Sequence, residues 1–460
     1  MKKFYNEDLI VAIATAVGGG VGIIRISGKD RKNLQNLVEN ITKSRLNLEN
    51  LQQRFCYFSQ FVDSKNNILD SGLLVYFAAP NSFTGEEIVE LHGHGGKIVC
   101  QMLLNRCLEL GARLANPGEF SQRAFFNEKI NLLQAEAIAD LVAASTSKAV
   151  QSANKSLNGE FSDKINAISE KLTQLRALIE AFLDFPEEDI DFIKDSDAKA
   201  RLQEILTDLT KLLGNARQGK ILQSGLNVVL VGKPNVGKSS LMNYFAKEDF
   251  AIVSEIAGTT RDTLKSAINL QGIPLNIIDT AGLRDLHQTA DEVEKIGIGR
   301  THKEIANADV VIFLQDIFDF QNNENQGENE LNIKFPENVP ILKVINKIDL
   351  CENSADFANS ENQNAVFISV KQQIGLQNLE QQLLNLIGWH EDENIFIARE
   401  RHIIALKKAL EFAQNAALLQ EPELVAEELR NAQSELAEIV GEITPDDLLD
   451  KIFSQFCIGK

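Results

Sequence analysis

The spacing of apolar residues changes twice along this chain. Residues 1–118 alternate short apolar runs with stretches of helical spacing, and turn signals such as Asn116-Pro117-Gly118 separate them. The apolar runs, which predict strands, are 9–15, 21–27 and 72–77, and the stretches that predict helices are 30–42 and 96–110. This alternation predicts a small α/β domain at residues 1–118.

After residue 118 the apolar positions follow helical spacing. Apolar residues recur at intervals of four and three at Phe161, Ile165, Ile168, Leu172, Leu175, Ile179 and Phe182. This pattern predicts an amphipathic helix with a bundle-like seam, and a second helix is predicted over 198–213. Because helical spacing returns later, we interpret residues 119–217 and 387–460 as one helical domain interrupted by 218–386. Two separate helical pieces are the alternative.

The inserted segment begins with a phosphate-binding motif. Residues 232–239 read GKPNVGKS, which is a complete G-x-x-x-x-G-K-S sequence. It follows the apolar run 226–231, which predicts a buried strand, and precedes a helical stretch at 240–246. In this context Lys238 is expected to reach the β- and γ-phosphates of a nucleotide, and the Ser239 hydroxyl to hold Mg²⁺.

A second motif predicts how the metal ion and the terminal phosphate are held. The apolar run at 275–282 ends in D-T-A-G. Asp279 is expected to reach Mg²⁺ through water, and the Gly282 N–H to bond the γ-phosphate. In Ras-like proteins a glutamine follows this motif and orients the attacking water, but here the position is Leu283. No arginine finger is evident, so another group must supply that charge.

Two further motifs predict guanine as the base. The segment 339–350 ends in N-K-x-D, where Asp349 can accept both N–H groups of the guanine edge, a pattern that adenine lacks. Asn346 and Lys347 are expected to brace the base and the phosphate loop, and the tip 369–371 after a third apolar strand resembles the S-A-K base loop of GTPases. The nucleotide contacts predicted by these motifs are Asn235, Val236, Gly237, Lys238, Ser239, Ser240, Asp279, Thr280, Ala281, Gly282, Asn346, Lys347, Ile348, Asp349, Ser369, Val370 and Lys371.

Length, net charge and cysteine content restrict the number of domains, the binding partners and the cellular location that we expect. A chain of 460 residues predicts two to four domains, and a net charge of −19 argues against tight, nonspecific RNA binding by this chain alone. Five cysteines without a C-x-x-C pair are typical of a reducing, cytoplasmic location. We expect no membrane span, because no stretch of about 18 apolar residues occurs. His92 and His94 form an H-x-H that we interpret as part of a glycine-rich turn.

Motifs spread over the full length carry a family resemblance. They are VGIIRISG (21–28), NSFTGEE (81–87), LHGHGG (91–96), PGEFSQRAF (117–125), AGTTRD (257–262), DTAGLR (279–284) and the terminal FCIGK (456–460). With them the chain resembles the MnmE (TrmE) family of tRNA-modification GTPases. The resemblance implies an N-terminal α/β folate-binding and dimerisation domain, a discontinuous helical domain and an inserted Ras-like P-loop GTPase domain.

The resemblance also implies an activity. The family couples potassium-activated GTP hydrolysis to the addition of a carboxymethylaminomethyl or aminomethyl group at C5 of the wobble uridine of certain tRNAs. It acts as a homodimer that forms a heterotetramer with the flavoprotein MnmG (GidA), which carries FAD. A 5-formyltetrahydrofolate or related tetrahydrofolate supplies the one-carbon unit.

Site residues carry over where the motifs match. Asn235, Ser254, Ile256 and Thr259 are implied as potassium ligands, and Thr260 joins Ser239 on Mg²⁺ and is catalytic with Lys238. The loop that supplies the additional nucleotide contacts is Ser254, Glu255, Ile256, Ala257, Gly258, Thr259 and Thr260. The family has a water-orienting Glu where this chain has Asp285, which keeps the carboxylate on a shorter arm; a solvated loop residue is the alternative.

The folate site is implied by the resemblance alone. Its matching positions are Arg25, Glu90, Lys129 and Lys460, which offer a carboxylate for the pterin edge and cations for the formyl oxygen and glutamate tail. Cys457 is interpreted as a neighbour of that site without covalent chemistry. An Era- or EngA-like GTPase of ribosome assembly is the alternative function, but neither a KH-type G-x-x-G loop after residue 385 nor a second phosphate loop is found.

Overall fold

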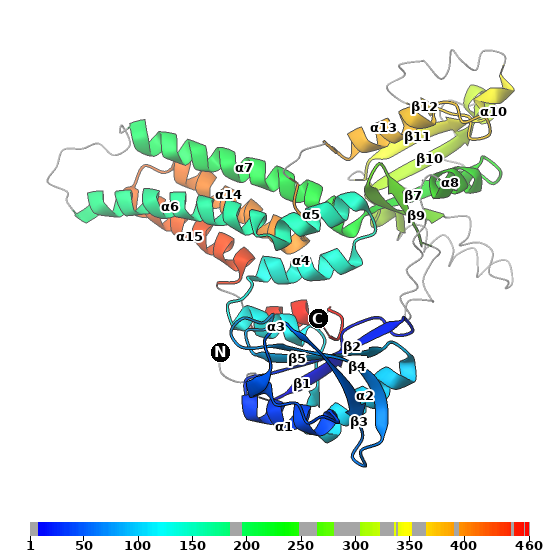
Figure 1. The fold of residues 1–460 in the computed structure, drawn as a ribbon. Helices are drawn as coiled ribbons and strands as arrows, with labels where there is room; N and C mark the ends of the chain where they lie inside the picture. The colour runs from blue at the N-terminus through cyan, green and yellow to red at the C-terminus, as the bar shows by residue number, and fades with distance from the viewer. Residues whose placement is uncertain are drawn as a thin grey trace, which may run out of the picture. The chain divides into compact units, whose positions relative to one another are not determined.

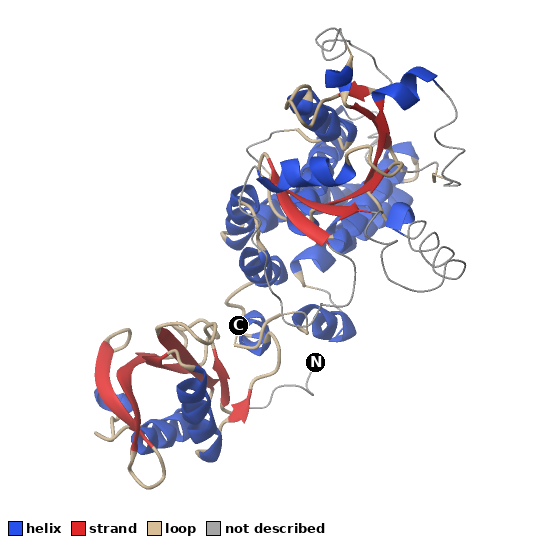
Figure 2. Cartoon of the chain, turned by 90° about the vertical axis from the view of Figure 1, so that its right-hand side faces the viewer, coloured by secondary structure: helices blue, strands red, loops and turns tan. Residues whose placement is uncertain are grey.

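The computed structural model describes residues 8–184, 196–247, 265–279, 304–322, 335–336, 339–351, 365–390, 395–442, 446–454 and 456–459. Contacts between residues divide the chain into two compact units, of which the first comprises Met1–Val142, Ser156–Ile205 and Glu411–Lys460 and the second comprises Ala143–Lys155 and Leu206–Leu410. Each unit contains one six-stranded sheet with helices packed against it (Figures 1 and 2). The domain bounds expected from the sequence stay a prediction.

The sheet of the first unit has the strand order β3-β4-β5-β2-β1-β6, in which only the β1–β6 pair is parallel. Its strands are β1 (Ile10–Ile13), β2 (Val21–Gly28), β3 (Cys56–Val62), β4 (Ile68–Phe77), β5 (Glu87–His94) and β6 (Arg113–Leu114). Helices α1 (Arg31–Ile41) and α2 (Lys97–Glu109) pack on one face, where Leu34 and Leu103 meet Ile24 and Leu91 in one core (Figure 1). The α/β class predicted for this region is confirmed.

Strand β5 corrects one interpretation from the sequence. His92 and His94 lie within the strand, not in a turn. Alternation places Val89 and Leu91 in the core, so Glu90, His92 and His94 share the opposite face. The glycine between the two histidines is explained by a close neighbour, because a Cβ at Gly93 would lie 2.4 Å from the Asp70 carboxylate.

A buried ion cluster fixes the short helix α3 (Glu119–Phe126) to the first sheet. The Arg123 guanidinium lies 2.9 Å from Glu86 and 3.0 Å from both Glu119 and Asp8. Arg113 adds contacts of 2.7 Å to Asp8 and to Glu119. Burial by itself raises the pKa of Glu119, but the hydrogen bond from Arg113 and the charge of Arg123 outweigh it and hold the pKa below its usual value.

The remaining helices carry the seam that the sequence predicted. They are α4 (Leu132–Ala143), α5 (Ser147–Leu157), α6 (Glu160–Asp184), α7 (Ser196–Ser224), α14 (Glu400–Leu418), α15 (Pro422–Val440) and α16 (Asp446–Phe453). Helices α6 and α15 run side by side (Figure 1), and every seam residue of α6 from Phe161 to Ile179 is buried. The Phe182 side chain lies outside the described residues. The second predicted helix is longer than expected, since α7 continues past residue 213.

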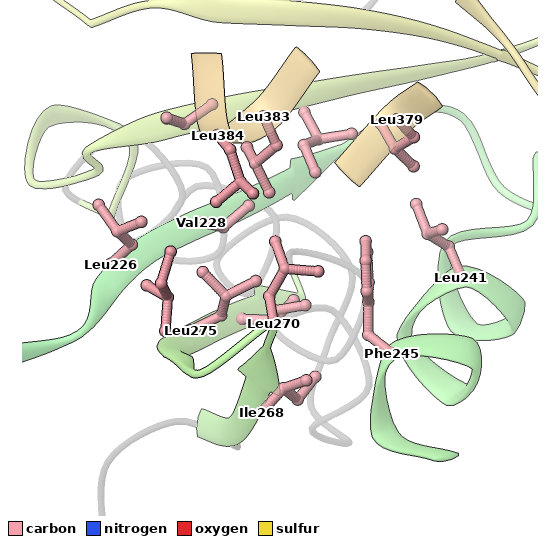
Figure 3. Close-up of a cluster of buried hydrophobic side chains, with 14 of the residues drawn as sticks. Leu226, Val228, Leu241, Phe245, Ile268, Leu270, Leu275, Leu379, Leu383 and Leu384 are labelled. Carbon is pink, nitrogen blue, oxygen red and sulfur yellow. The ribbon is translucent and has the colours of Figure 1, made fainter. Parts of the chain in front are cut away.

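The sheet of the second unit has the order β12-β11-β10-β7-β9-β8, in which every pair is parallel except β8–β9. Its strands are β7 (Leu226–Val231), β8 (Lys265–Leu270), β9 (Ile273–Asp279), β10 (Val310–Asp316), β11 (Ile341–Asn346) and β12 (Val366–Phe367), and its helices are α8 (Lys238–Lys247), α10 (Ile317–Asn322) and α13 (Leu376–Leu386). Figure 3 shows Leu379 and Leu383 of α13 and Phe245 of α8 converging on Leu270 and Leu275 in one buried cluster.

This sheet confirms the nucleotide-binding fold predicted for the inserted segment. A mostly parallel sheet with helices against it is the architecture that places ligands at the carboxyl ends of its strands. One detail differs from the sequence interpretation. Residues 316–332 are rich in Asn, Gln, Asp and Glu, a composition that predicts a surface loop. In the structure 317–322 form α10, whose first turn is capped by the Asp316 carboxylate accepting the Phe318 N–H at 2.8 Å.

Candidate nucleotide-binding site

The predicted phosphate loop connects β7 to α8 with a backbone that only particular residues tolerate. Gly237 has a φ of +107°, and a Cβ there would lie 2.2 Å from the Asn346 amide nitrogen. The position therefore excludes any side chain. The Lys238 side chain is buried, and its Nζ donates to the carbonyl oxygens of Gly232 and Lys233, both at 2.8 Å. The lysine ammonium is thus held inside the loop by backbone oxygens.

Asn346 joins the three nucleotide motifs to one another. Its Nδ2 donates to the Val236 carbonyl in the phosphate loop at 2.9 Å, and its Oδ1 accepts the Val370 N–H of the base loop at 3.2 Å. The side chain is only 3% exposed, so both halves of its amide are satisfied inside the protein. The bracing role that the N-K-x-D motif predicts for Asn346 would use these two contacts.

The segment predicted to contact the base is also held by hydrogen bonds within the protein. The Ser369 hydroxyl donates to Asp349 Oδ1 at 2.6 Å, which orients the carboxylate. Lys347 has a φ of +66°, and its Nζ lies 3.1 Å from Asp316 Oδ2 at the end of β10. Burial raises the pKa of Asp316, but the hydrogen bond from Lys347 and two backbone N–H groups outweigh it and keep the pKa below the ordinary value.

These segments surround a cavity of about 600 Å³. Its lining residues are Asn235, Gly237, Ser240, Asn243, Tyr244, Asn346, Lys347, Asp349, Leu350, Val370, Lys371 and Gln373. Eight of these were predicted from the motifs, whereas Asn243, Tyr244, Leu350 and Gln373 were not. The volume lies within the range of small-molecule sites, about 300–1,000 Å³. The cavity therefore brings the phosphate loop and both base motifs to one space.

Part of the predicted site falls outside the described residues. Asp279 ends β9, but its side chain is not among those described. The other positions outside the described part are Ser254, Glu255, Ile256, Ala257, Gly258, Thr259, Thr260, Thr280, Ala281, Gly282, Asp285 and Lys460. Their predicted roles stay predictions.

The structure brings Arg25 and Glu90 together in the first unit. The two residues are direct cross-strand partners on β2 and β5, and Arg25 Nε lies 2.8 Å from Glu90 Oε1. His92 Nε2 lies 3.0 Å from Glu90 Oε2. The Arg25 guanidinium also donates to the Gly459 carbonyl at 3.4 Å and stands 5.8 Å from the centre of the Phe120 ring. A chain segment that ends the sequence is thereby tied to the sheet.

Electrostatics keep Glu90 ionised in this pair. Burial raises its pKa, but the His92 hydrogen bond and the Arg25 charge outweigh it and leave the pKa below the usual value. His92 was not among the residues predicted from the sequence, although alternation along a strand would have placed it on the same face as Glu90.

Lys129 is exposed and lies next to Gly85, where a Cβ would be 3.2 Å from Lys129 Cγ. Cys457 is also exposed, and its carbonyl accepts the Gly118 N–H.

A phosphate loop that shares an asparagine bridge with an N-K-x-D strand end is the arrangement of P-loop GTPases, and this chain is one. Two family models extend that statement. The model described as GTP-binding protein TrmE N-terminus matches residues 9–129, and the MnmE helical domain matches residues 132–457. The chain belongs to the MnmE family.

Proteins of similar sequence align with nearly the whole length of this chain. A protein of Dechloromonas aromatica (strain RCB) described as tRNA modification GTPase MnmE is 51% identical over 99% of this chain and 100% of its own. A protein of Herminiimonas arsenicoxydans with the same description is 47% identical over 99% and 100%. Among solved structures, Aquifex aeolicus Era bound to GDP and AlF4⁻ is 26% identical, covering 43% of this chain and 68% of that chain with a TM-score of 0.27.

Across the described residues, the helices include none with the length and apolar character needed to cross a bilayer.

Proposed function

We propose that this chain hydrolyses GTP to drive modification of C5 of the wobble uridine in tRNA. The observation that carries the nucleotide half is the Asn346 bridge, which joins the phosphate loop to the base loop around a cavity that Asp349 lines. The tRNA half is supported by relatives named as tRNA modification GTPases that align with the entire chain. We further propose a cytoplasmic location, where tRNA substrates are found.

The residues around the cavity suit a guanine nucleotide with Mg²⁺. A carboxylate at Asp349 accepts two N–H donors, and Lys238 offers a cation to the phosphates. Ser239, in the first turn of α8, has the hydroxyl that a hard cation takes, and Thr260 is proposed as its companion. When bound, Mg²⁺ supplies charge neutralisation at the β- and γ-phosphates.

Potassium is proposed to take the place of an arginine finger. Asn235 belongs to the phosphate loop, lines the cavity and has a φ of +65°. Its side-chain oxygen, with oxygens of Ser254, Ile256 and Thr259, offers the neutral ligands that a monovalent cation needs. Such a cation would stabilise the charge that develops on the phosphates. Asp285 is proposed to orient the hydrolytic water.

The experiment that tests this proposal is GTP turnover by the purified protein in potassium against sodium at equal ionic strength. One preorganised charge is worth about 10²–10³ in rate, so we expect at least about tenfold stimulation by potassium. Equal, slow rates in both salts would contradict the potassium site. Asp285→Asn should lose the stimulated rate while it keeps GTP affinity, and an unchanged stimulated rate would exclude the water-orienting role.

A second site is proposed for a tetrahydrofolate one-carbon donor such as 5-formyltetrahydrofolate. Glu90, held by Arg25 and His92, still has acceptor positions for pterin N–H groups, while Arg25, Lys129 and Lys460 offer cations. Hydrogen bonds to charged groups contribute about 1.5–3 kcal/mol, so Glu90→Gln is expected to weaken 5-formyltetrahydrofolate binding at least about tenfold in calorimetry. Glu109→Gln, on an exposed carboxylate paired with Arg106, is the matched control. Equal affinities of the three proteins would contradict the site.

The partners proposed are a second copy of this chain, the FAD-containing flavoprotein MnmG (GidA) and tRNA. A monomeric mass in light scattering would contradict the homodimer, and failure to co-elute with MnmG would contradict the heterotetramer. The alternative of a ribosome-assembly GTPase is not favoured, because the family models together match residues 9–129 and 132–457.

A further inference from the structure

Tyr244 lines the nucleotide cavity but belongs to none of its sequence motifs. It lies on α8, the helix that begins at Lys238, and its partly buried ring packs against the core of the second unit. Its hydroxyl donates to Glu380 Oε1 of α13 at 3.0 Å. The orientation of this wall of the cavity is therefore fixed by a hydrogen bond to a neighbouring helix.

Glu380 connects that wall to a second element. The side chain is buried, at 6% exposed, and its other oxygen, Oε2, accepts from Gln271 Nε2 at 3.1 Å. Gln271 and Gly272 form the tight turn between β8 and β9, with φ values of +50° and +92°. Hydrogen bonds to a buried carboxylate are strong and directional, so the two oxygens tie α8 to the hairpin turn.

The apolar packing beneath these groups makes the connection stiff. Figure 3 shows Phe245 of α8, Leu270 beside the turn and Leu379 of α13 in one buried cluster. Since Tyr244 and Glu380 are the sequence neighbours of Phe245 and Leu379, the hydrogen-bonded groups lie on elements that already share a core. Close-packed cores transmit displacements.

The hairpin turn in turn contacts α5. A Cβ at Gly272 would lie 2.5 Å from Lys148 Cδ, so the stem of Lys148 runs across the turn. The Lys148 ammonium stands 5.7 Å from the centre of the Trp389 ring, within cation–π range. Trp389 is the single tryptophan of the chain and is 7% exposed. Contacts thus continue from the cavity wall to a residue with its own optical signal.

We propose that Tyr244 is a positioning residue of the nucleotide site and that Glu380 and Gln271 couple occupancy of the cavity to the Lys148–Trp389 contact. The proposal rests on the guanine-nucleotide binding proposed above. A nucleotide that presses on the Tyr244 ring would move the turn, because the tyrosine hydroxyl and Gln271 share one carboxylate. Coupling of this kind is an energetic link between two places, so a substitution that breaks the link at the turn is expected to alter nucleotide affinity.

The test measures Trp389 emission and, by calorimetry, GDP affinity in the full chain with Mg²⁺. GDP should change the emission of the wild type. Tyr244→Phe removes the hydrogen bond that links the cavity to the turn, so most of the emission change should be lost in that variant. Typical coupling is about 5-fold or more in affinity, so Gln271→Ala should bind GDP at least about fivefold more weakly. Tyr57→Phe, which removes a hydroxyl bonded to the Gln52 N–H in the other unit, is the matched control and should behave as the wild type.

The outcomes separate the two proposals. If the wild type fails to bind GDP, the proposed function is wrong and the coupling falls with it. If it binds GDP but its emission does not change, or changes equally in Tyr244→Phe, only the coupling is wrong. A role in stability alone would lower the melting temperature of Tyr244→Phe and leave the emission response to GDP intact.

Discussion

Asp349→Asn is expected to exchange guanine for xanthine as the preferred base. Asp349 Oδ1 accepts the Ser369 hydroxyl at 2.6 Å, and the residue lines the nucleotide cavity. In the variant the asparagine Oδ1 can keep the serine bond, which turns its NH₂ group toward the base. Guanine presents two N–H donors to that position, so donor would meet donor. Xanthine carries a carbonyl there and can accept the new donor.

The expected loss of GDP affinity in Asp349→Asn follows from the loss of the carboxylate charge. Guanine loses a charge-assisted pair and faces an unmatched polar group, and sites built for such hydrogen bonds reject mismatched ligands by about 10⁴–10⁵. We expect GDP affinity to fall at least about 100-fold and xanthosine diphosphate affinity to rise, both by calorimetry. Asp319→Asn, whose carboxylate is exposed 3.7 Å from Lys233, is the matched control. Unchanged GDP affinity would remove Asp349 from base recognition.

From the sequence we predicted those residues of the candidate site that lie in short contiguous motifs. Asn346, Asp349 and Gly237 are examples, because their chemistry is set by neighbours a few residues away and by the strand that precedes each of them. Tyr244 could not be found this way. Its place in the cavity depends on the packing of α8 against α13, and Glu380 lies 136 residues further along the chain.

The first sheet shows a second reason why local patterns fail. Glycines on both sides of His94 indicate a turn when only local propensity is considered. In the structure Gly93 accommodates the Asp70 carboxylate and Gly95 a close approach of the chain at Val21, where a Cβ would lie 2.8 Å from the backbone. Here tertiary contacts, not turn geometry, require glycine, and the strand continues through Gly93 and ends at His94. Likewise, a single cap at Asp316 outweighs the polar composition that suggested a loop.

Lys238→Met is expected to lower GTP turnover more than any other single change. The methionine keeps the length and packing of the buried stem but removes the ammonium, which here is bonded to the Gly232 and Lys233 carbonyl oxygens. Those neutral acceptors hold the amine inside the loop, so a phosphate with full negative charge can replace them without moving the lysine backbone. The site thus has its cation in place before the nucleotide arrives, and the variant has none.

Loss of one preorganised donor to developing charge costs about 10²–10³ in rate, so turnover under potassium should fall by at least that factor. Phosphate release under single-turnover conditions measures it directly. Lys233→Ala is the matched control, because this lysine is in the same loop but its ammonium reaches the exposed Asp319 at 3.7 Å and not the loop interior. Equal losses in the two variants would mean that general loop disruption, and not the missing cation, slows hydrolysis.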